Sequence, residues 1–310
     1  MEAASAGGEQ AQAVVGAMTT ALVTVSDDRS GRKGGLYAAT QAQAAKLISD
    51  APWLGIDMVR SWTWDRIVRT PWYEANRLMV DQVQPDMNGR AYKPFVIHSC
   101  LRELAPGDFL IYNDASPELW HGRTPDPKQH DLAVLKCLCA SNGGVLTIQS
   151  RFIMPVTHRG DATHENFTLE RCMERMGLSR YRHSLQHAST LVVLQKNARS
   201  VEFVEDWLRW NVIDECASLG PAGSGRHDYW VEEVPKHGKI GHRHDQSISG
   251  LLVNAMGLKL LKDISSYNFL DVCRRDRQYE LIEGNLPPSK YRYRNVRGDD
   301  GVYRYEETLR

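Results

Sequence analysis

Asp114 is the first candidate for chemistry in this sequence, because it closely follows a short apolar segment, residues 109–112. An apolar strand that ends in small polar residues presents them at the carboxyl edge of an α/β sheet, where ligands bind. A single carboxylate there can hold Mg²⁺ or Mn²⁺ when substrate phosphates complete the oxygen shell. The alternative is that Asn113 and Asp114 only cap a turn. Asp108 begins the same segment, one strand length away, so it cannot share an ion with Asp114.

A second candidate is Lys93, which stands between Tyr92 and Pro94 at the start of an amphipathic run. Proline is favoured at the first position of a helix, so this pattern predicts that a helix begins at Pro94. A lysine at that place can neutralise a diphosphate leaving group. An ordinary surface lysine at a helix start is the alternative interpretation.

The third candidate is the segment 237–247, HGKIGHRHDQS, which precedes an apolar-periodic run at 248–258. Its position predicts Asp245 near a helix N-terminus, where a carboxylate caps backbone N–H groups and meets the positive end of the helix dipole. Three histidines and an aspartate within residues 237–245 also suggest zinc. However, His242 and His244 would point apart on a strand, and no His-x-x-x-His spacing is present, so zinc is the minor alternative.

Ser26, Asp27 and Asp28 follow the first apolar segment, residues 20–25, and precede a glycine-rich basic loop. The end of the first strand is a favoured nucleotide site in open α/β sheets. There the carboxylates can accept hydrogen bonds from a ribose or a base, while the basic side chains of the loop meet phosphates. A solvated turn that caps the next helix is an equally good interpretation.

The elements that must position these residues alternate along the chain. Short β-branched or apolar runs predict strands, and apolar residues at helical spacing predict helices. Strands are expected at 20–25, 56–62, 109–112, 145–148 and 189–194; helices are expected at 36–48, 72–83 and 201–210, and an amphipathic segment at 167–176. This alternation predicts an α/β fold with a mainly parallel mixed sheet flanked by helices.

Length and composition indicate one domain. The chain has 310 residues, no internal repeat and no clean linker, so we expect a disordered segment at 1–18, one domain at 19–275 and a charged, peripherally packed tail at 276–310. Its 38 basic and 38 acidic residues balance, which argues against nucleic acid as a partner. No window is apolar enough for a transmembrane helix, and six cysteines without a Cys-x-x-Cys pair favour cytosolic thiols. We expect a cytoplasmic protein that reaches a membrane only through partners.

The candidate groups occur in a specific order along the chain. Ser-Asp-Asp at 26–28 is followed by Asn76, by Tyr-Lys-Pro at 92–94 and by Tyr-x-Asp-Ala at 112–115. Further on come Gln186 and Ala188, Phe-Val-x-x-Trp at 203–207 and His-Arg-His-Asp-Gln-Ser at 242–247. Over residues 20–262 this order resembles the nucleotide-sugar glycosyltransferases of GT-A fold found in polysaccharide and capsule biosynthesis loci. The resemblance implies a single GT-A-like, Rossmann-related domain.

The resemblance also implies which residues bind the donor. Asp114 matches the last carboxylate of the family's metal-binding Asp-x-Asp motif; Asn113 lies beside it, and Tyr112 fills the place of the first Asp. Lys93 would face the donor diphosphate. The nucleoside would be bound by Ser26, Asp27 and Asp28. A UDP- or GDP-sugar is the implied donor, and Mn²⁺ or Mg²⁺ the implied cofactor at Asp114.

The block at 244–247 resembles the element beside the donor sugar and acceptor in several retaining GT-A enzymes. It implies that Asp245 lies near the anomeric carbon together with Gln246. The acceptor or sugar side would be bound by His244, Ser247 and Gln186. Because an amide is a poor nucleophile, we expect front-face attack rather than a covalent intermediate if configuration is retained, which we favour. If configuration is inverted, Asp245 is the candidate base for the acceptor hydroxyl.

The expected function is therefore metal-assisted transfer of a hexosyl or related group from a nucleoside-diphosphate donor to a glycan or another hydroxyl acceptor. Two alternatives remain. Tyr112, in the place of a carboxylate, favours a non-catalytic relative that binds a nucleotide sugar or carbohydrate. The histidines and aspartate of 237–245 favour a metal-dependent hydrolase.

Overall fold

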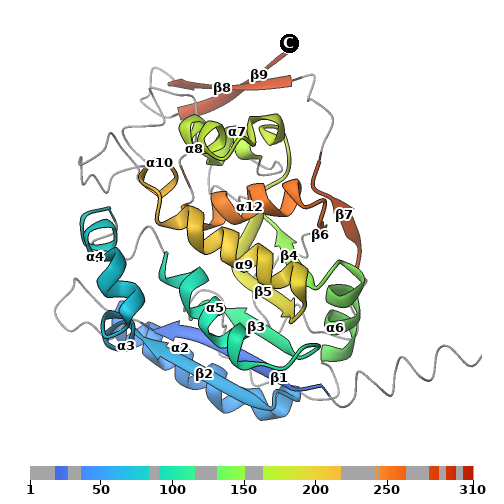
Figure 1. The fold of residues 1–310 in the computed structure, drawn as a ribbon. Coiled ribbons are helices and arrows are strands. Elements are labelled where there is room, and N and C mark those ends of the chain that lie inside the picture. The colour runs from blue at the N-terminus through green and yellow to red at the C-terminus, as the bar shows by residue number, and fades with distance from the viewer. Residues whose placement is uncertain are drawn as a thin grey trace, which may run out of the picture.

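The structure, a computed structural model, describes residues 18–26, 36–83, 91–115, 131–150, 163–217, 242, 244–262, 279–285, 291–297 and 303–309. Within them the chain forms a seven-stranded sheet and a separate two-stranded sheet (Figure 1). The larger sheet contains β1 (Thr20–Ser26), β2 (Met58–Thr63), β3 (Phe109–Asn113), β4 (Val145–Gln149), β5 (His187–Gln195), β6 (Lys259–Leu261) and β7 (Leu281–Glu283). The smaller sheet pairs β8 (Tyr291–Arg297) with β9 (Tyr303–Leu309), both in the segment predicted as a charged tail.

The larger sheet is mixed but mainly parallel. Its strand order is β2-β1-β3-β5-β4-β6-β7. Strand β1 pairs in parallel with β2 and β3, and β4 with β6, whereas β5 and β7 pair antiparallel with their neighbours. Five of these seven strands therefore run in one direction, which confirms the predicted α/β fold. Their carboxyl ends share one edge of the sheet, the edge at which α/β proteins bind ligands.

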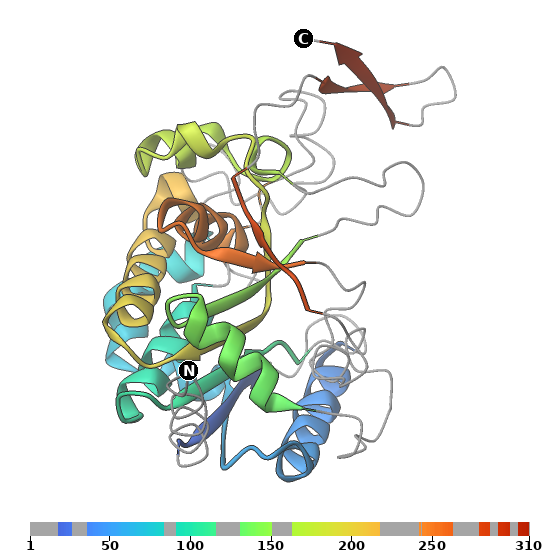
Figure 2. The same cartoon turned by 90° about the vertical axis from the view of Figure 1, so that its right-hand side faces the viewer.

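Helices cover both faces of the sheet. Successive side chains of a strand point to opposite faces, and apolar side chains on both faces must be covered. In β3, Leu110 and Tyr112 belong to one buried apolar cluster, and Phe109 and Ile111 belong to another. The first cluster is covered by α3 (Trp64–Val68), α4 (Pro71–Val83), α5 (Tyr92–Glu103), α8 (Glu170–Arg175), α9 (Ala198–Asn211) and α12 (Asp245–Ala255). The second is covered by α2 (Leu36–Asp50), η1 (Ala51–Leu54) and α6 (Leu132–Ser141). Figure 2 shows α9 and α12 on one side of the sheet and α2 on the other.

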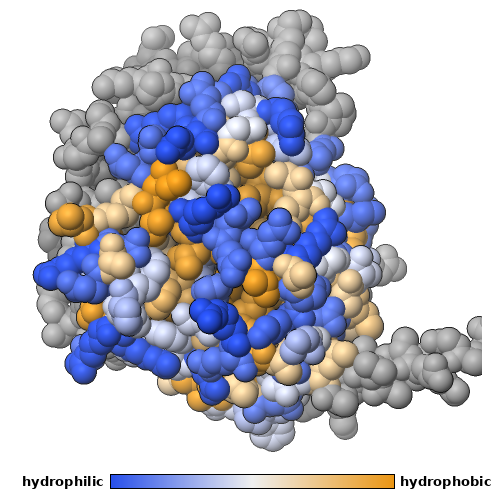
Figure 3. Space-filling view, viewed as in Figure 1, coloured by the Kyte–Doolittle hydropathy of each residue, from blue (hydrophilic) through white to orange (hydrophobic). Residues whose placement is uncertain are grey.

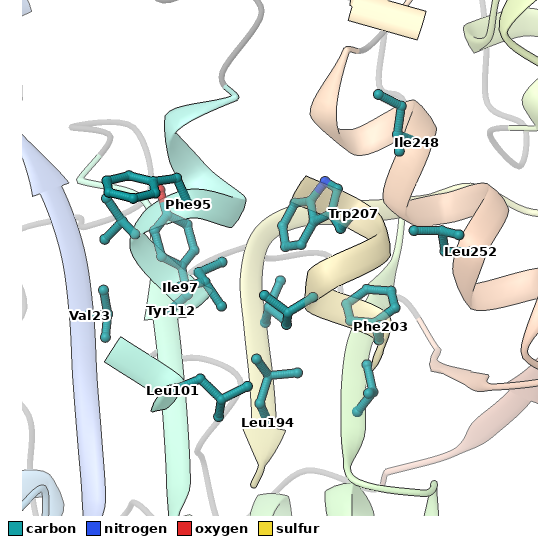
Figure 4. Close-up of a cluster of buried hydrophobic side chains, with 14 of the residues drawn as sticks. Val23, Phe95, Ile97, Leu101, Tyr112, Leu194, Phe203, Trp207, Ile248 and Leu252 are labelled. Carbon is teal, nitrogen blue, oxygen red and sulfur yellow. The ribbon is translucent and has the colours of Figure 1, made fainter. Parts of the chain in front are cut away.

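Large aromatic side chains fill the core between the sheet and the helices α5, α9 and α12 (Figure 4). Trp207 and Phe203 of α9 are fully buried, and so is Tyr112 of β3. Phe95 of α5 stacks on Trp72 with 4.3 Å between ring centroids. Burial of a large apolar side chain stabilises the folded state by about 1.5–3 kcal/mol. This core therefore fixes the starts of α5 and α12 against the end of β3.

The predicted strands correspond to β1 through β5, and the predicted helices to α2, α4 and α9. The segment 167–176 differs, because Thr168 and Leu169 adopt extended conformations that separate α7 (His164–Phe167) from α8. Helix α5 begins at Tyr92, so Pro94 is its third residue and not its first. Proline is tolerated there because the first four N–H groups of a helix have no intrahelical partner. Shorter elements complete the described chain: η3 (Ser179–Tyr181) and α10 (Asp214–Ala217).

The face of the molecule over α5, α9 and α12 carries hydrophilic residues with hydrophobic ones between them (Figure 3). Leu78 of α4 is the most exposed large hydrophobic side chain in the described part, at 73%. No helix in the described part of the chain has both the length and the apolar character needed to cross a membrane.

Candidate functional site

Several of the predicted site residues lie at the carboxyl edge of the sheet. Strand β1 ends at Ser26, which is buried, and Asp114 follows the last residue of β3. Helix α12 begins with Asp245, and Lys93 extends from the first turn of α5. Lys93, Asp114 and Asp245 belonged to three separate candidate groups in the sequence. The fold brings them into direct contact.

Lys93 connects the two carboxylates. Its Nζ lies 3.2 Å from Asp114 Oδ1, 3.3 Å from Asp114 Oδ2 and 3.2 Å from Asp245 Oδ2. It also donates to the carbonyl oxygen and the hydroxyl of Ser189, each at 3.1 Å. Lys93 is 0% exposed, so the alternative of an ordinary surface lysine is wrong. A buried ammonium requires such partners because an unpaired charge in the interior is costly.

Asp114 lies at the outer side of this group, with its side chain 12% exposed. Tyr112 donates its hydroxyl to Asp114 Oδ1 at 2.6 Å. Burial, followed by the negative charge of Asp114, raises the pKa of Tyr112 well above its usual value. The phenol therefore stays a neutral donor. Tyr112 supports the carboxylate of Asp114, whereas a second aspartate at its position would have repelled it.

Asp245 is 1% exposed and is the first residue of α12, as predicted. Ser189 donates to Asp245 Oδ2 at 2.8 Å, and the indole N–H of Trp207 donates to the Asp245 carbonyl oxygen at 2.9 Å. The positive end of the helix dipole favours a negative charge at this position. The preceding residue, His244, has φ 47° and ψ −117°. Non-glycine residues rarely adopt such backbone angles, and those that do cluster at functional sites.

Gln246, the next residue, belongs to a second group without charged members. Its Nε2 donates to Gln186 Oε1 at 3.0 Å, and Gln186 Nε2 donates to Ser247 Oγ at 3.3 Å. We call Gln186, Gln246 and Ser247 the amide cluster. We call the other group, Tyr112, Lys93, Asp114, Ser189 and Asp245, the charged cluster. Adjacent residues of one helical turn, Asp245 and Gln246, thus serve different clusters.

Two buried histidines lie behind these clusters. His187 bonds Ser249 Oγ through Nε2 at 2.5 Å, and His164 bonds Thr168 Oγ1 through Nδ1 at 2.9 Å. Burial is the main cause that lowers the pKa of each histidine to about 3, and the neighbouring His164 and Lys93 contribute to the lowered pKa of His187. Both imidazoles are therefore neutral at physiological pH. They pack α7 and β5 against α12.

The histidines of 237–247 form no metal site within the described residues. His242 accepts from the Leu169 N–H at 3.2 Å and donates to the Cys216 carbonyl oxygen at 2.6 Å, so both of its ring nitrogens bond to backbone. The ring of His244 lies edge-on to that of His242, with 5.6 Å between centroids. In the part of the chain that the structure describes, no three His, Cys, Asp or Glu side chains are grouped to hold a metal ion. His237 lies outside the described residues.

The oxygen atoms at Asp114 do not suit the predicted resident Mn²⁺ or Mg²⁺. Asp114 Oδ1 accepts from Tyr112 and pairs with Lys93, and Oδ2 also accepts from Lys93. The other carboxylate of the charged cluster, Asp245, is committed to the same ammonium. A divalent cation would thus meet oxygens that already surround a positive charge. The metal stays a prediction that this donor set does not support.

Several predicted donor-binding residues stay untested. Asp27 and Asp28 and the basic loop after them lie outside the described residues. Asn113 is buried, and its side-chain amide donates to the Asp114 carbonyl oxygen at 2.8 Å.

Ser189 is the member of the charged cluster that was not predicted from the sequence. It is 56 positions from Asp245 in the chain, and its only signal was a hydroxyl at the start of a predicted strand, next to that of Thr190.

A scan against protein-family models gives no match, and a search of curated proteins gives none either. The functional argument therefore rests on the geometry of the two clusters.

Proposed function

We propose that this chain is a glycosyltransferase that moves a sugar from a nucleoside-diphosphate donor to a hydroxyl group of a glycan or another acceptor. The observation that carries the proposal is the contact of Lys93 with both Asp114 and Asp245 at the carboxyl edge of a Rossmann-like sheet. The three residues come from the start of α5, the end of β3 and the start of α12. Ligands of α/β proteins bind at this edge.

The two carboxylates have different parts in this reaction. Asp114 is the more exposed and faces the donor, together with Asn113. Asp245 is close enough to Lys93 to stay paired, and its negative charge stabilises the positive charge that develops at the anomeric carbon. Gln246 is a poor nucleophile, so retention proceeds by front-face attack of the acceptor. In an inverting reaction Asp245 would be the base.

The amide cluster supplies the neutral donors and acceptors that sugar hydroxyl groups require. Gln186, Gln246 and Ser247 already exchange hydrogen bonds with one another, and we assign them with His244 to the sugar or acceptor side. Buried polar groups of this kind discriminate strongly against ligands that leave them without partners. A UDP- or GDP-sugar is the donor class, and the cytoplasm is the compartment in which we place the reaction.

A donor screen tests the proposal. Purified protein is incubated with UDP- and GDP-sugars, and release of the nucleoside diphosphate is measured with and without hydroxyl acceptors. We expect release from at least one donor, and a loss of about 100-fold or more in Asp245→Asn, because an electrostatic contact of this kind contributes that much to the rate. Asp108→Asn is the matched control, since Asp108 caps backbone N–H groups at the opposite end of β3. Release that persists in Asp245→Asn would contradict the role of Asp245.

The burial of Asp245 favours one alternative, a non-catalytic protein that binds a nucleotide sugar. A side chain that is 2% exposed and paired with Lys93 leaves little of its carboxylate to reach a substrate. Thermal stabilisation by a nucleotide sugar, without any release of nucleoside diphosphate, would support this alternative. The hydrolase alternative loses support because His242 is bonded to backbone through both ring nitrogens.

A further inference from the structure

Five oxygen atoms surround the ammonium of Lys93. Two belong to Asp114, at 3.2 and 3.3 Å, and one belongs to Asp245, at 3.2 Å. The other two are the carbonyl and hydroxyl oxygens of Ser189, both at 3.1 Å. We call these five atoms the oxygen cage. A shell made only of oxygens, with two carboxylates in it, is the kind of shell that hard metal cations take in proteins.

The surroundings of the cage favour a positive charge inside it. Ser189 donates its hydroxyl hydrogen to Asp245 Oδ2, so its oxygen lone pairs remain for Lys93. The ring of Tyr112 lies 5.4 Å from Nζ and contributes a cation–π contact. Lys93 itself comes from the first turn of α5, where the helix dipole opposes a cation. Its position is therefore stabilised by the cage and not by its own helix.

We propose that the Lys93 ammonium is the resident cation of this cage and stands in the place that a divalent metal between Asp114 and Asp245 would occupy. The wild-type chain then binds no divalent metal at these two carboxylates. Removal of the ammonium, as in Lys93→Met, converts the cage into a metal-binding site. The cage accounts for the presence of both carboxylates without the Mn²⁺ or Mg²⁺ that the sequence pattern implies.

The distances support an ammonium over a small divalent ion. N–H···O hydrogen bonds span about 2.7–3.2 Å, whereas Mg²⁺ requires oxygens at about 2.0–2.1 Å. The cage oxygens at 3.1–3.3 Å would have to move inward by about 1 Å to hold Mg²⁺. They are carried by β5, α12 and the residue after β3, and in the wild type the Lys93 ammonium between them holds them at this separation; once it is removed, the side chains of Asp114 and Asp245 can move inward to an ion. A cation tethered to a fourth element, α5, meets the same charge requirement without that movement.

A titration with MnCl₂ in the absence of nucleotide tests cation occupancy. Free Mn²⁺ is measured by electron paramagnetic resonance, and the unfolding midpoint is followed in parallel. We expect no saturable Mn²⁺ binding at the oxygen cage of the wild type. We expect saturable Mn²⁺ binding to Lys93→Met, at least tenfold tighter than any binding to the control variant named next. The double variant Lys93→Met/Asp245→Asn is the control, because it keeps one carboxylate and cannot bridge an ion. Saturable binding to the wild type that disappears in Asp114→Asn would overturn the proposal.

Folding of Lys93→Met is itself informative, because the substitution leaves two buried carboxylates without their cation. If the variant is recovered only in the presence of Mn²⁺, the metal has replaced the ammonium and the proposal is supported. If Lys93→Met is not recovered with or without Mn²⁺, the titrations of the wild type and of Asp114→Asn decide. Mn²⁺ binding to the wild type but not to Asp114→Asn refutes the proposal. Absence of Mn²⁺ binding to both proteins supports it.

The consequence for catalysis rests on the proposed function. We expect the wild type to release nucleoside diphosphate in excess EDTA at a rate within about twofold of its rate with Mn²⁺. Loss of release in EDTA would overturn this consequence. If no donor is turned over at all, the proposed function fails, while the Mn²⁺ titration still decides which cation the cage holds. The two failures are thus distinguishable.

Discussion

The two ends of strand β3 each carry an aspartate, and the two carboxylates are bound in different ways. At the amino end, Asp108 accepts hydrogen bonds from the Thr19 and Ala105 backbone N–H groups at 3.0 and 2.9 Å. Just before β2, which lies on the far side of β1 from β3, Asp57 accepts from the Thr20 N–H at 2.7 Å. At the carboxyl end, Asp114 is bonded to the side chains of Tyr112 and Lys93.

The difference separates a structural carboxylate from a candidate functional one. Asp108 and Asp57 satisfy N–H groups that the fold would otherwise leave without partners, so stability explains them fully. A buried ion pair is weak evidence for stability, because the cost of removing two charges from water often exceeds their attraction. The Lys93–Asp114–Asp245 group therefore calls for a second explanation, and position at the ligand-binding edge of the sheet provides it.

The largest expected effect concerns Lys93. Lys93→Met should lower the free energy of unfolding by about 3–5 kcal/mol, because it leaves the charges of Asp114 and Asp245 buried without their partner. Urea denaturation at pH 7 measures this. Lys136→Met is the matched control: Lys136 lies 5.6 Å from the ring of Phe109 and is only half-buried, so its loss should cost less than about 1 kcal/mol. Equal losses in both variants would remove the distinction between the two lysines.

The second prediction compares the two ends of β3 directly. Asp114→Asn should reduce nucleoside diphosphate release by about 100-fold, since it removes one of the two carboxylates that hold the Lys93 ammonium at the ligand-binding edge of the sheet. Its unfolding free energy should fall less than that of Lys93→Met, because Asp245 and Ser189 still pair with the ammonium. Asp108→Asn should retain release and lose about 1–2 kcal/mol of stability, because its backbone partners become poorly satisfied. Steady-state rates and denaturation curves of both variants provide the measurement. The comparison fails if the two variants lose activity to the same degree.

The third prediction concerns pH. The folded-state pKa of His187 is about 3, below its ordinary value of 6.5, so its contribution to stability is present above pH 6.5 and is lost as pH falls toward 3. Between pH 7 and pH 5 this single histidine should cost the wild type about 2 kcal/mol. His187→Gln keeps a donor near Ser249 and cannot titrate, so its stability should decline less over the same range. Identical slopes in the two proteins would show that His187 is not neutral in the fold.

The smallest effect is expected in the amide cluster. Gln246 is only partly buried, and its hydrogen bond to Gln186 joins two neutral groups. Gln246→Ala should therefore lower the free energy of unfolding by less than about 1 kcal/mol. Release of nucleoside diphosphate should fall less than tenfold, against about 100-fold for Asp245→Asn. A larger loss in Gln246→Ala would move the centre of the site from the charged cluster to the amide cluster.

Most of the fold was predictable because its signals are local. The β-branched run of β1 and the helical periodicity of α9 each identify an element within a few residues. The division of α7 from α8 was not predictable in this way. At this break the Leu169 N–H donates to His242, which lies 73 residues away in the chain. Pairing of β5 between β3 and β4 likewise depends on contacts remote in sequence.

The sequence predicted most residues of the candidate site but not how they are arranged. Asp114 follows a strand, and Asp245 opens a helix, both readable from neighbouring residues. The burial of Lys93 was not readable, because the sequence around Tyr92 and Pro94 suits a surface lysine equally well. Ser189 had no signal beyond a hydroxyl in a strand. Its role appears only when β5 is placed beside the end of β3.

Periodicity and the residue types at strand ends are local properties of the chain, so the sequence predicted the α/β class, most of the elements and the polar residues at their ends. The pairing of one ammonium, from Lys93, with both Asp114 and Asp245 is visible only in the folded chain. A buried charge interacts with the groups that are close to it in space, whatever their separation along the chain. For Lys93, Asp114 lies 21 positions away in the chain, and Asp245 lies much farther along it, at the start of α12.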